Sequence, residues 1–326
     1  MLKSKLILGS ACVALACLAL PAAGQSNGQI SLVVPYPAGG GSDFIARTIA
    51  PALSKALDRI IIIENLSGAG GAVGSNRVLQ RPADGRTLLL GSPNEVILAP
   101  AVNPALEYKP DAFRLVGPAT QTSQVLVGRP NLEAADVRAL IARSKAPNTD
   151  AVSYGSVGIG SLYHVTGAVL AAETGGNMFH VPYRGAAPLV QDLMGGQVDV
   201  SFLPLAGNVL GLIREKKLKA YGVAQAERNP LAPEIPTLGE VAPELKSFQY
   251  PTWAGLLVRA ETPDDEVRKL QAALKQALSD PQVRSAIEAS GSAVAEPLSL
   301  EQAKDQYRRE TEQFLKIVAD RAISVN

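Results

Sequence analysis

The sequence predicts an α/β protein of two domains that are joined by two crossovers. Two observations carry this prediction. A series of strand, glycine-rich turn and helix runs twice along the chain, and a late strand with helices returns from the second series to the first. Apolar residues make up 47% of the 326 residues, which is enough for two cores.

The first series opens with a strand at residues 30–35. The glycine-rich segment 37–43 follows, and helical spacing of apolar residues predicts a helix over 42–57. Ser42 is a good candidate for the cap of this helix, and Asp43 suits its first turn. Strand, turn and helix together form one α/β unit.

The next strand is expected at 59–64, where a continuous β-branched run is typical of a strand covered on both faces. The glycine-rich segment 68–74 leads into a helix that ends near Pro82, and the third strand spans 87–92. Ser92 therefore lies at the carboxyl end of a strand, the edge at which open α/β sheets bind ligands.

A strand and crossover at 113–127 lead into the second series. Its glycine-rich segment, 155–161, lies between a strand at 152–155 and a helix over 161–174. Further strands are expected at 179–183, 198–202 and 219–224, and further helices at 132–145, 187–194 and 208–215.

The chain is expected to return to the first domain near its end. Residues 253–258 predict a strand, a helix starts at Pro263, and Ser299 with Gln302 has capping-box spacing for the last helix. We therefore assign residues 25–123 and 249–326 to domain 1 and residues 124–248 to domain 2.

Residues 1–24 are predicted to be a cleavable signal peptide. Lys3 and Lys5 precede an apolar run over 6–20, and small residues follow it. An uncleaved anchor and lipidation of Cys17 are the alternatives. We expect a soluble protein that is exported to the periplasm.

Both cysteines, Cys12 and Cys17, lie inside this leader, so the mature chain has no thiol for disulfides, metal ligation or nucleophilic attack. The formal net charge is +1, from 31 basic and 30 acidic residues, which leaves no basic surplus for binding nucleic acid. We expect a monomer without metal or cofactor.

Segments 37–43 and 155–161, the first and second glycine turns, both have the features of an anion site. Small side chains let a ligand approach backbone N–H groups at a helix start, where unpaired donors and the helix dipole favour negative charge. A single turn is as readily explained by relief of backbone strain. Two turns, one in each domain, predict that a small carboxylate or phosphate is held from both sides of a cleft.

The sequence offers little for catalysis. His164 and His180 are its two histidines, and it has neither a Gly-x-Ser-x-Gly motif nor a phosphate-binding loop. Ser161 and His164 are three residues apart on one helix, so an exported hydrolase is the enzymatic alternative. Packing under the cleft floor explains His164 as well, and His180 is expected to be structural. We expect no enzyme.

An ordered set of motifs resembles the Bug family, the periplasmic solute receptors of tripartite tricarboxylate transporters. The motifs are Tyr36-Pro37-Ala38-Gly39-Gly40-Gly41-Ser42-Asp43, Glu64-Asn65 with Gly68-Ala69-Gly70-Gly71, Pro82-Ala83-Asp84-Gly85-Arg86, Tyr154-Gly155-Ser156 with Gly158 and Gly160-Ser161, and His180-Val181-Pro182-Tyr183-Arg184-Gly185. With Trp253-Ala254-Gly255-Leu256 and the helical tail, the likeness covers essentially all of the mature chain.

The resemblance implies a type II periplasmic-binding-protein fold that closes over a small carboxylate and presents it to membrane permease subunits. In this family, backbone donors, hydroxyls and water hold the ligand. The matching positions here are Tyr36, Ala38, Gly39, Ser42, Asp43, Ser156, Gly158, Gly160, Ser161 and His164, with Ser92 and Tyr183 as further contributors. Because family members bind dicarboxylates, aromatic acids and amino acids, membership does not name the ligand.

One position departs from the family pattern. Many relatives have an acidic residue just after the phenylalanine of the strand at 198–202, where this chain has Leu203-Pro204. An amino-acid ligand is therefore less favoured. A binding domain of this kind can also act on a sensor kinase instead of a permease, and the sequence leaves both uses open.

Overall fold

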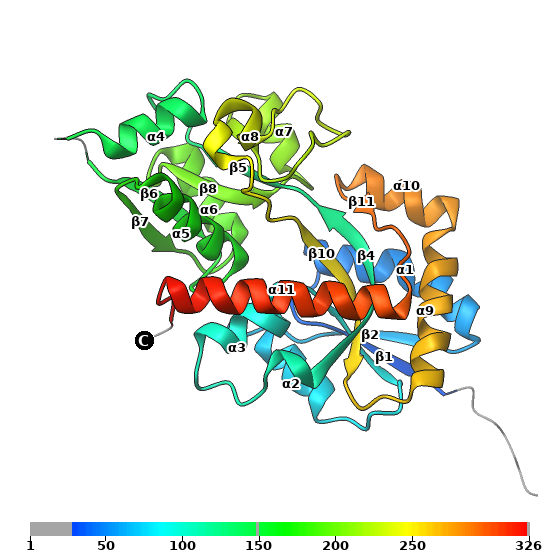
Figure 1. Ribbon diagram of the computed structural model, residues 1–326. Helices are drawn as coiled ribbons and strands as arrows, with labels where there is room; N and C mark the ends of the chain where they lie inside the picture. Colours follow the sequence, from blue (N-terminus) through cyan, green and yellow to red (C-terminus); the bar gives the residue numbers. More distant parts are fainter. Residues whose placement is uncertain (1–27, 148–149, 325–326) are drawn as a thin grey trace, which may run out of the picture.

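The computed structural model describes residues 28–147 and 150–324, so the predicted signal peptide and both cysteines lie outside the described residues. Two lobes, each a sheet flanked by helices, lie one above the other in Figure 1. Of the helices in the described residues, none combines the length and the apolar character that crossing a membrane requires.

The first sheet has the strand order β11-β4-β10-β3-β1-β2. Its strands are β1 (Ile30–Val34), β2 (Ile61–Asn65), β3 (Thr87–Gly91), β4 (Phe113–Thr122), β10 (Thr252–Arg259) and β11 (Ala293–Val294). Strand β1 pairs in parallel with β2 and β3, whereas β10 runs antiparallel between β3 and β4. The expected α/β unit with a late returning strand is confirmed.

The second sheet has the order β7-β6-β8-β5-β9. Its strands are β5 (Gln124–Gly128), β6 (Val152–Ser156), β7 (Met178–Pro182), β8 (Val200–Pro204) and β9 (Lys219–Val223). Strand β6 is parallel to β7 and β8, and β5 is antiparallel to β8 and β9. In this sheet one antiparallel strand, β5, is set among parallel ones, as β10 is in the first sheet, which also has the antiparallel edge strand β11.

The chain passes from the first sheet to the second through a single residue, Ser123, between β4 and β5. Strand β4 leaves the first sheet at the carboxyl edge of its parallel strands. Strand β5 starts at the carboxyl edge of the second sheet, where Gln124 pairs with Pro204 at the end of β8. The carboxyl edges of both sheets therefore face the same crossing.

The returning crossover lies beside the outgoing one. Thr252, the first residue of β10, pairs with Thr122, the last residue of β4. The Gln124 side chain donates to the carbonyl of Tyr250 (2.5 Å), and the Ser123 hydroxyl donates to the Gln225 side chain (2.6 Å). The two strands that join the sheets are thus bonded into one connection, and the domain limits at 124 and 249 stay predictions.

The helices pack on the faces of the two sheets. They are α1 (Gly41–Leu57), α2 (Ala72–Leu79), α3 (Ala99–Val102), α4 (Val137–Lys145), α5 (Leu162–Thr174), α6 (Ala186–Gly195), α7 (Val209–Arg214), α8 (Leu238–Val241), α9 (Asp264–Leu278), α10 (Pro281–Ala289) and α11 (Leu300–Asp320). Short turns of 3-10 helix occur at Ala69–Gly71, Pro110–Ala112 and Pro243–Leu245, and a π-helical turn, η2, spans Asn94–Leu98.

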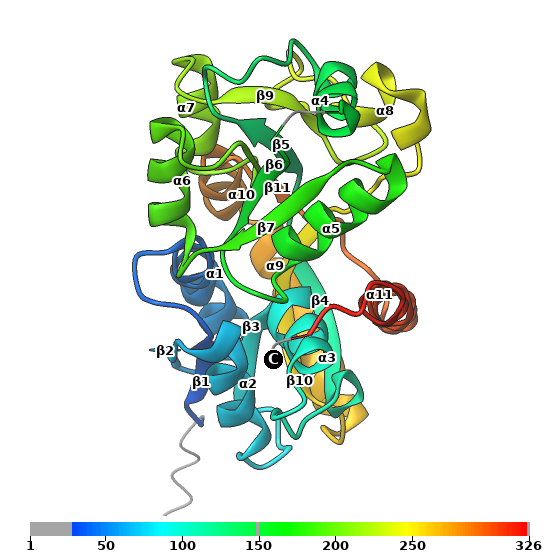
Figure 2. The ribbon, with the colours of Figure 1, turned by 90° about the vertical axis from the view of Figure 1, so that its left-hand side faces the viewer.

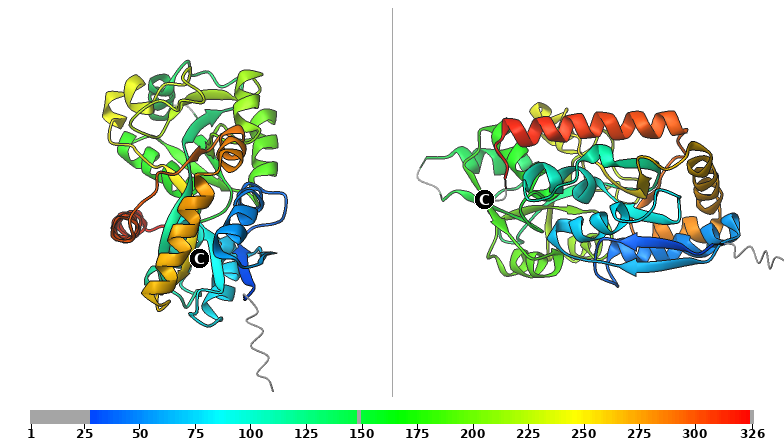
Figure 3. Two further views of the ribbon diagram at one scale, coloured as in Figure 1. Left: turned by 90° about the vertical axis from the view of Figure 1, so that its right-hand side faces the viewer. Right: turned by 90° about the horizontal axis from the view of Figure 1, so that it is seen from below.

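Helix α11 lies against the first sheet, as predicted for the tail. Its buried side chains include Tyr307 and Phe314, and the Trp253 indole N–H of β10 donates to Glu310 (2.6 Å). Figure 2 shows this helix end-on beside β4 and β10, and Figure 3 shows it running along one side of the molecule as far as the second lobe. One apolar cluster accordingly continues from α11 into α5 without a break.

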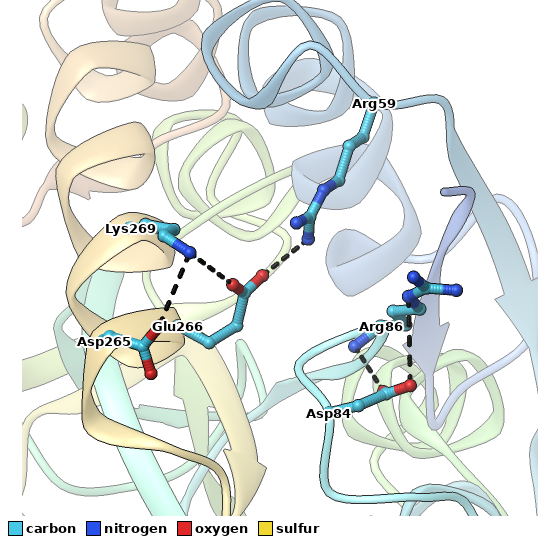
Figure 4. A network of polar contacts seen from close by, with 6 residues as sticks. All are labelled: Arg59, Asp84, Arg86, Asp265, Glu266 and Lys269. Atoms are coloured by element: carbon cyan, nitrogen blue, oxygen red, sulfur yellow. Dashed lines mark hydrogen bonds and ion pairs between the residues drawn. The ribbon is translucent and has the colours of Figure 1, made fainter. Parts of the chain in front are cut away.

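Helix α9 is held to the opposite side of the first sheet by an ionic contact (Figure 4). The Arg59 guanidinium lies 2.5 Å from Glu266 at the start of α9, and Lys269 lies 3.3 Å from the same carboxylate. A Cβ atom at Gly85 would lie 2.4 Å from the Glu266 side chain, so the turn at 84–86 packs directly on this ion pair. The motif around Gly85 therefore serves packing at this point.

Strand β2 differs from its prediction. The β-branched run at 59–64 predicted a strand covered on both faces, but β2 is the edge strand of its sheet. Ile60 is 65% exposed and Ile62 is 41% exposed. The prediction was wrong because β-branched residues show strand propensity, whereas the covering of each face depends on which elements pack on the sheet.

Two predicted helix starts also differ. Helix α1 has Gly40 as its N-cap, with no side-chain cap, and Ser42 lies inside the first turn instead of capping it. The predicted helix at 132–145 begins only at Val137, where Asp136 caps it through the Ala139 N–H (2.8 Å). In contrast, Ser299 and Gln302 form the capping box predicted for α11.

We expect Ser299→Ala to lower the free energy of unfolding by about 1 kcal/mol, because it removes the N-cap of the longest helix. The matched variant Ser42→Ala should cost less, because its hydroxyl makes no cap bond. Urea unfolding followed by circular dichroism measures both. Equal losses would mean that Ser42 caps α1 in solution.

Candidate functional site

The two lobes touch where the segments after β3 and β6 meet. Asn94, in the π-helical turn after β3, accepts a hydrogen bond from the backbone N–H of Leu162 through its side-chain oxygen (2.7 Å). Leu162 is the first residue of α5. A side chain of the first lobe therefore occupies a backbone donor at the helix start of the second, at the edge where such sheets bind ligands.

A second contact joins the same edges. Gly160, in the second glycine turn, packs on Val102 at the end of α3, and a Cβ atom built on it would lie 2.1 Å from a Val102 methyl group. Its φ of +75° is also one that side chains disfavour. Glycine at this position lets the two lobes approach each other.

The donors of the second glycine turn are largely bonded within the turn. Gly160 N–H donates to the ring Nδ1 of His164 (3.0 Å), and His164 N–H donates to the Ser161 hydroxyl oxygen (3.3 Å). The Ser161 hydroxyl donates in turn to the Gly158 carbonyl (2.8 Å). Ser161 is the N-cap of α5, which was predicted to start at this residue.

Ser156 also stabilises the second glycine turn. Its fully buried hydroxyl donates to the Gly158 carbonyl (2.9 Å), accepts from the Gly158 N–H (3.2 Å) and lies 2.7 Å from His180 Nε2. A serine hydroxyl has one proton and two lone pairs, so these three contacts use it completely if His180 donates. Ser156 thus holds the loop with bonds of its own.

The two histidines stack on each other beneath the turn. Their ring centroids are 3.7 Å apart at an angle of 9°, and Tyr154 lies against His180. Burial lowers the pKa of His164 to about 4, and burial together with neighbouring His164 lowers that of His180 to about 4. Both rings are therefore neutral near pH 7, and His164 carries its proton on Nε2 because Nδ1 accepts from Gly160.

The pair required by the hydrolase alternative is not assembled. The Ser161 hydroxyl donates to Gly158, and the Nδ1 atom of His164 is bonded to Gly160. The serine and histidine that the structure brings together are Ser156 and His180, and that serine is fully buried. These contacts position the turn and present no activated nucleophile.

The first glycine turn is bonded to a carboxylate of the chain itself. Asp43 Oδ2 accepts from the Gly39 N–H (2.9 Å) and from Arg47 Nε (2.9 Å). The Arg47 guanidinium and then the Gly39 amide lower the pKa of Asp43 to about 2. Ala38 and Gly39 are exposed, and Ser42 is partly buried. The donor that this turn was expected to offer a ligand is thus taken by Asp43.

A buried glutamate that the sequence did not single out organises the first lobe beside this turn. Glu95 is 0% exposed, and its Oε2 atom lies 2.8 Å from both the Tyr36 hydroxyl and the Ser92 hydroxyl. The Ser92 N–H donates to the other carboxylate oxygen. Burial raises the pKa of Glu95 to about 7, although the bonds from Ser92 and Tyr36 lower it.

Glu95 could have been identified in the sequence as a candidate buried residue, because it is a charged residue beside an apolar run. It follows Ser92 by three residues and precedes Val96, Ile97 and Leu98, all of them buried. The structure thereby brings together Tyr36 and Ser92, which the sequence placed in the site separately.

Tyr183 lies near the second turn but faces another element. Its backbone N–H donates to the Ser156 carbonyl (2.8 Å), whereas its hydroxyl donates to Asp192 of α6 (2.9 Å).

Among the described residues, no group of three or more histidine, cysteine, aspartate or glutamate side chains is arranged to hold a metal ion.

Comparisons with known proteins agree on one family. The family model described as "Tripartite tricarboxylate transporter family receptor" matches residues 45–319. The Bordetella pertussis protein BugT is 31% identical over 267 residues, which cover 80% of this chain and 80% of BugT.

Solved structures show the same likeness. MatC from Rhodopseudomonas palustris, with bound malate, is 31% identical with a TM-score of 0.78 over 89% of this chain and 99% of that one. A second R. palustris protein, with adipate, is 25% identical with a TM-score of 0.80 over 91% of this chain and 98% of that one.

We expect Gly160→Ala to hold the lobes apart, because its Cβ atom would collide with Val102. The matched variant Gly39→Ala carries a similar backbone strain, at φ +82°, but meets nothing within 4 Å. Small-angle scattering should give a larger radius of gyration for Gly160→Ala only, with partial recovery in Gly160→Ala/Val102→Ala. Equal radii in all variants would mean that the lobes are already apart in solution.

Stability should respond to pH through two opposing groups. The histidines titrate at about 4 when folded against 6.5 ordinarily, so the unfolded chain binds more protons between these values and acid destabilises the fold. Glu95 titrates at about 7 against 4.5, so it acts in the opposite direction between pH 4.5 and 7.

Glu95→Gln should therefore lose more stability than the wild type between pH 7 and pH 5, and His164→Gln should lose less. Urea unfolding at pH 7, 6 and 5 measures these slopes. A Glu95→Gln slope equal to that of the wild type would contradict the assigned titration.

Proposed function

The chain belongs to the family of tripartite tricarboxylate transporter receptors, and from this membership we propose that it binds a small organic carboxylate between its two lobes. The resemblance to the Bug family that the ordered motifs indicated is confirmed. We further propose that the protein delivers this ligand to the membrane subunits of a transporter of that type.

One observation carries the proposal of an interdomain site. The Asn94 side chain of the first lobe reaches the backbone donor of Leu162 at the start of α5 in the second lobe. This contact lies at the carboxyl edges of both sheets, where ligands of α/β proteins bind. A ligand oxygen can replace the Asn94 oxygen at that donor, which couples binding to the contact between the lobes.

The charges of the site suggest how the ligand lies. The first lobe contains Asp43, which is paired with Arg47, and the buried Glu95, so the ionised form of Glu95 disfavours a ligand carboxylate there. The second lobe offers the helix start of α5 and the Nε2–H of His164. We therefore place the ligand carboxylate against the second glycine turn, near Gly158, Gly160 and Ser161, and the rest of the ligand toward Tyr36 and Ser92.

The carboxylate class is supported by the relatives. MatC was solved with malate and the second R. palustris protein with adipate, both small carboxylates. Export through the leader at residues 1–24, action as a monomer and absence of enzymatic activity belong to the same proposal. Use of the bound state by a sensor kinase is the second candidate, and a missing response of transport to deletion of the protein would favour it.

We expect the mature protein to bind at least one acid of a broad carboxylate panel in isothermal titration calorimetry. His164→Ala should weaken that binding about tenfold or more, because it removes a donor to a charged group. Tyr307→Phe is the matched control, because it loses a hydrogen bond on α11 away from the turn.

A folded protein that binds no acid of the panel would contradict the receptor proposal. Equal affinity of His164→Ala and the wild type would contradict the placement of the carboxylate only. Mass spectrometry of small molecules that copurify with the native protein identifies the ligand independently. Turnover of esters or amides that is lost in His164→Ala would favour the hydrolase alternative.

A further inference from the structure

The hydroxyl protons of Tyr36 and Ser92 both point toward the carboxylate of Glu95. Tyr36 and Ser92 both bring their hydroxyl oxygens to 2.8 Å from the same oxygen of the buried Glu95. An ionised carboxylate only accepts hydrogen bonds, so each hydroxyl must donate its single proton to Glu95. The bonds are charge-assisted and internal, which makes this arrangement strong.

Both hydroxyls therefore keep only lone pairs for any other partner. Tyr36 can accept a bond and cannot donate one. Ser92 already accepts a long contact from the Asn94 N–H (3.4 Å) and keeps a further lone pair. Two groups that ordinarily donate to a carboxylate ligand are thus converted into acceptors.

These hydroxyls belong to the face that meets the second lobe. Tyr36 follows β1 and Ser92 follows β3, both at the carboxyl edge, and both residues are partly exposed. Asn94, two residues after Ser92, accepts from the Leu162 N–H of α5 across the contact between the lobes (2.7 Å). Burial and then Glu95 raise the pKa of Tyr36, and Tyr163 of α5 adds a smaller increase. A ligand between the lobes accordingly meets Tyr36 and Ser92.

We propose that Glu95 makes this receptor select carboxylates that also carry a hydrogen-bond donor, a hydroxyl or an ammonium group, facing Tyr36 and Ser92. This inference rests on the proposed function and specifies its ligand class. A plain acid would leave the two acceptors unpaired in a closed site, and a second carboxylate there would oppose them and the charge of Glu95. Glu95 itself touches no ligand; it is a positioning residue for Tyr36 and Ser92.

Matched acids test the selection. Each series keeps one carbon skeleton and places hydrogen, hydroxyl or ammonium on carbon 2: propanoate, lactate and alanine; succinate, malate and aspartate; and 3-phenylpropanoate, phenyllactate and phenylalanine. Calorimetry at pH 8 keeps Glu95 ionised, because its pKa is about 7. A donor-bearing member should bind about tenfold or more tightly than the plain acid of its series.

Glu95→Gln should remove this preference. The Ser92 N–H requires an acceptor oxygen, so the amide nitrogen of glutamine takes the position between the two hydroxyls and donates to both. Their protons then turn toward the ligand, and the ratio of affinities between the ammonium acid and the plain acid of each series should fall about tenfold, through weaker binding of the ammonium acid, because an ammonium group cannot accept a hydrogen bond. Glu310→Gln is the control, since it changes a partly buried glutamate that bonds to Trp253 and to neither Tyr36 nor Ser92, and it should leave the ratio unchanged.

Tyr36→Phe guards against a Glu95 variant that fails to fold, because it removes one acceptor and leaves Glu95 in place. It should also reduce the ratio. Plain acids that bind the wild type as tightly as their hydroxylated or aminated partners would overturn this inference and leave the carboxylate receptor standing. An unchanged ratio in Glu95→Gln and Tyr36→Phe would do the same, whereas absence of binding in all three series would overturn both.

Discussion

The arrangement of the molecule depends on one constraint, the single residue between β4 and β5. Because β4 runs with the parallel strands of its sheet and β5 runs against those of the next, both sheets must turn their carboxyl edges toward Ser123. The pairing of Thr252 with Thr122 brings the returning strand to the same place. The two adjacent connections keep the carboxyl edges of both sheets facing each other, and this is the edge at which open α/β sheets bind ligands.

The second glycine turn, which lies at that edge, is held in shape by hydrogen bonds within the loop. A turn rich in glycine has few side chains to hold its shape, and here Ser156, Ser161 and His164 hold it through bonds to its own backbone. Such internal bonding orders the loop before a ligand arrives, so less conformational entropy is lost on binding. It also means that a ligand must compete with, or replace, polar groups of the chain, as at the Leu162 N–H that Asn94 now occupies.

The polar groups are distributed unequally between the lobes. The first lobe carries Asp43 and Glu95, whereas the second carries two neutral histidines and the start of α5. In the function we propose, the second lobe therefore binds the ligand anion and the first lobe orients it. The acidic residue that is missing after Phe202 has no replacement in the same strand, but Glu95 brings a buried carboxylate to the site from the opposite lobe. The expectation that an amino-acid ligand is less favoured therefore stays a prediction.

An ordered set of motifs along the whole chain indicated the receptor family. Local patterns in the sequence determined the alternation of strands and helices and the capping box of α11. These features depend on residues within a few positions of each other. The exposure of Ile60 and the burial of Glu95 were decided by the tertiary structure. Asn94 and Leu162 are 68 residues apart, and only the facing of two sheet edges makes them partners. Periodicity and capping signals show which elements form, but the partner of each polar group depends on how those elements are brought together in space.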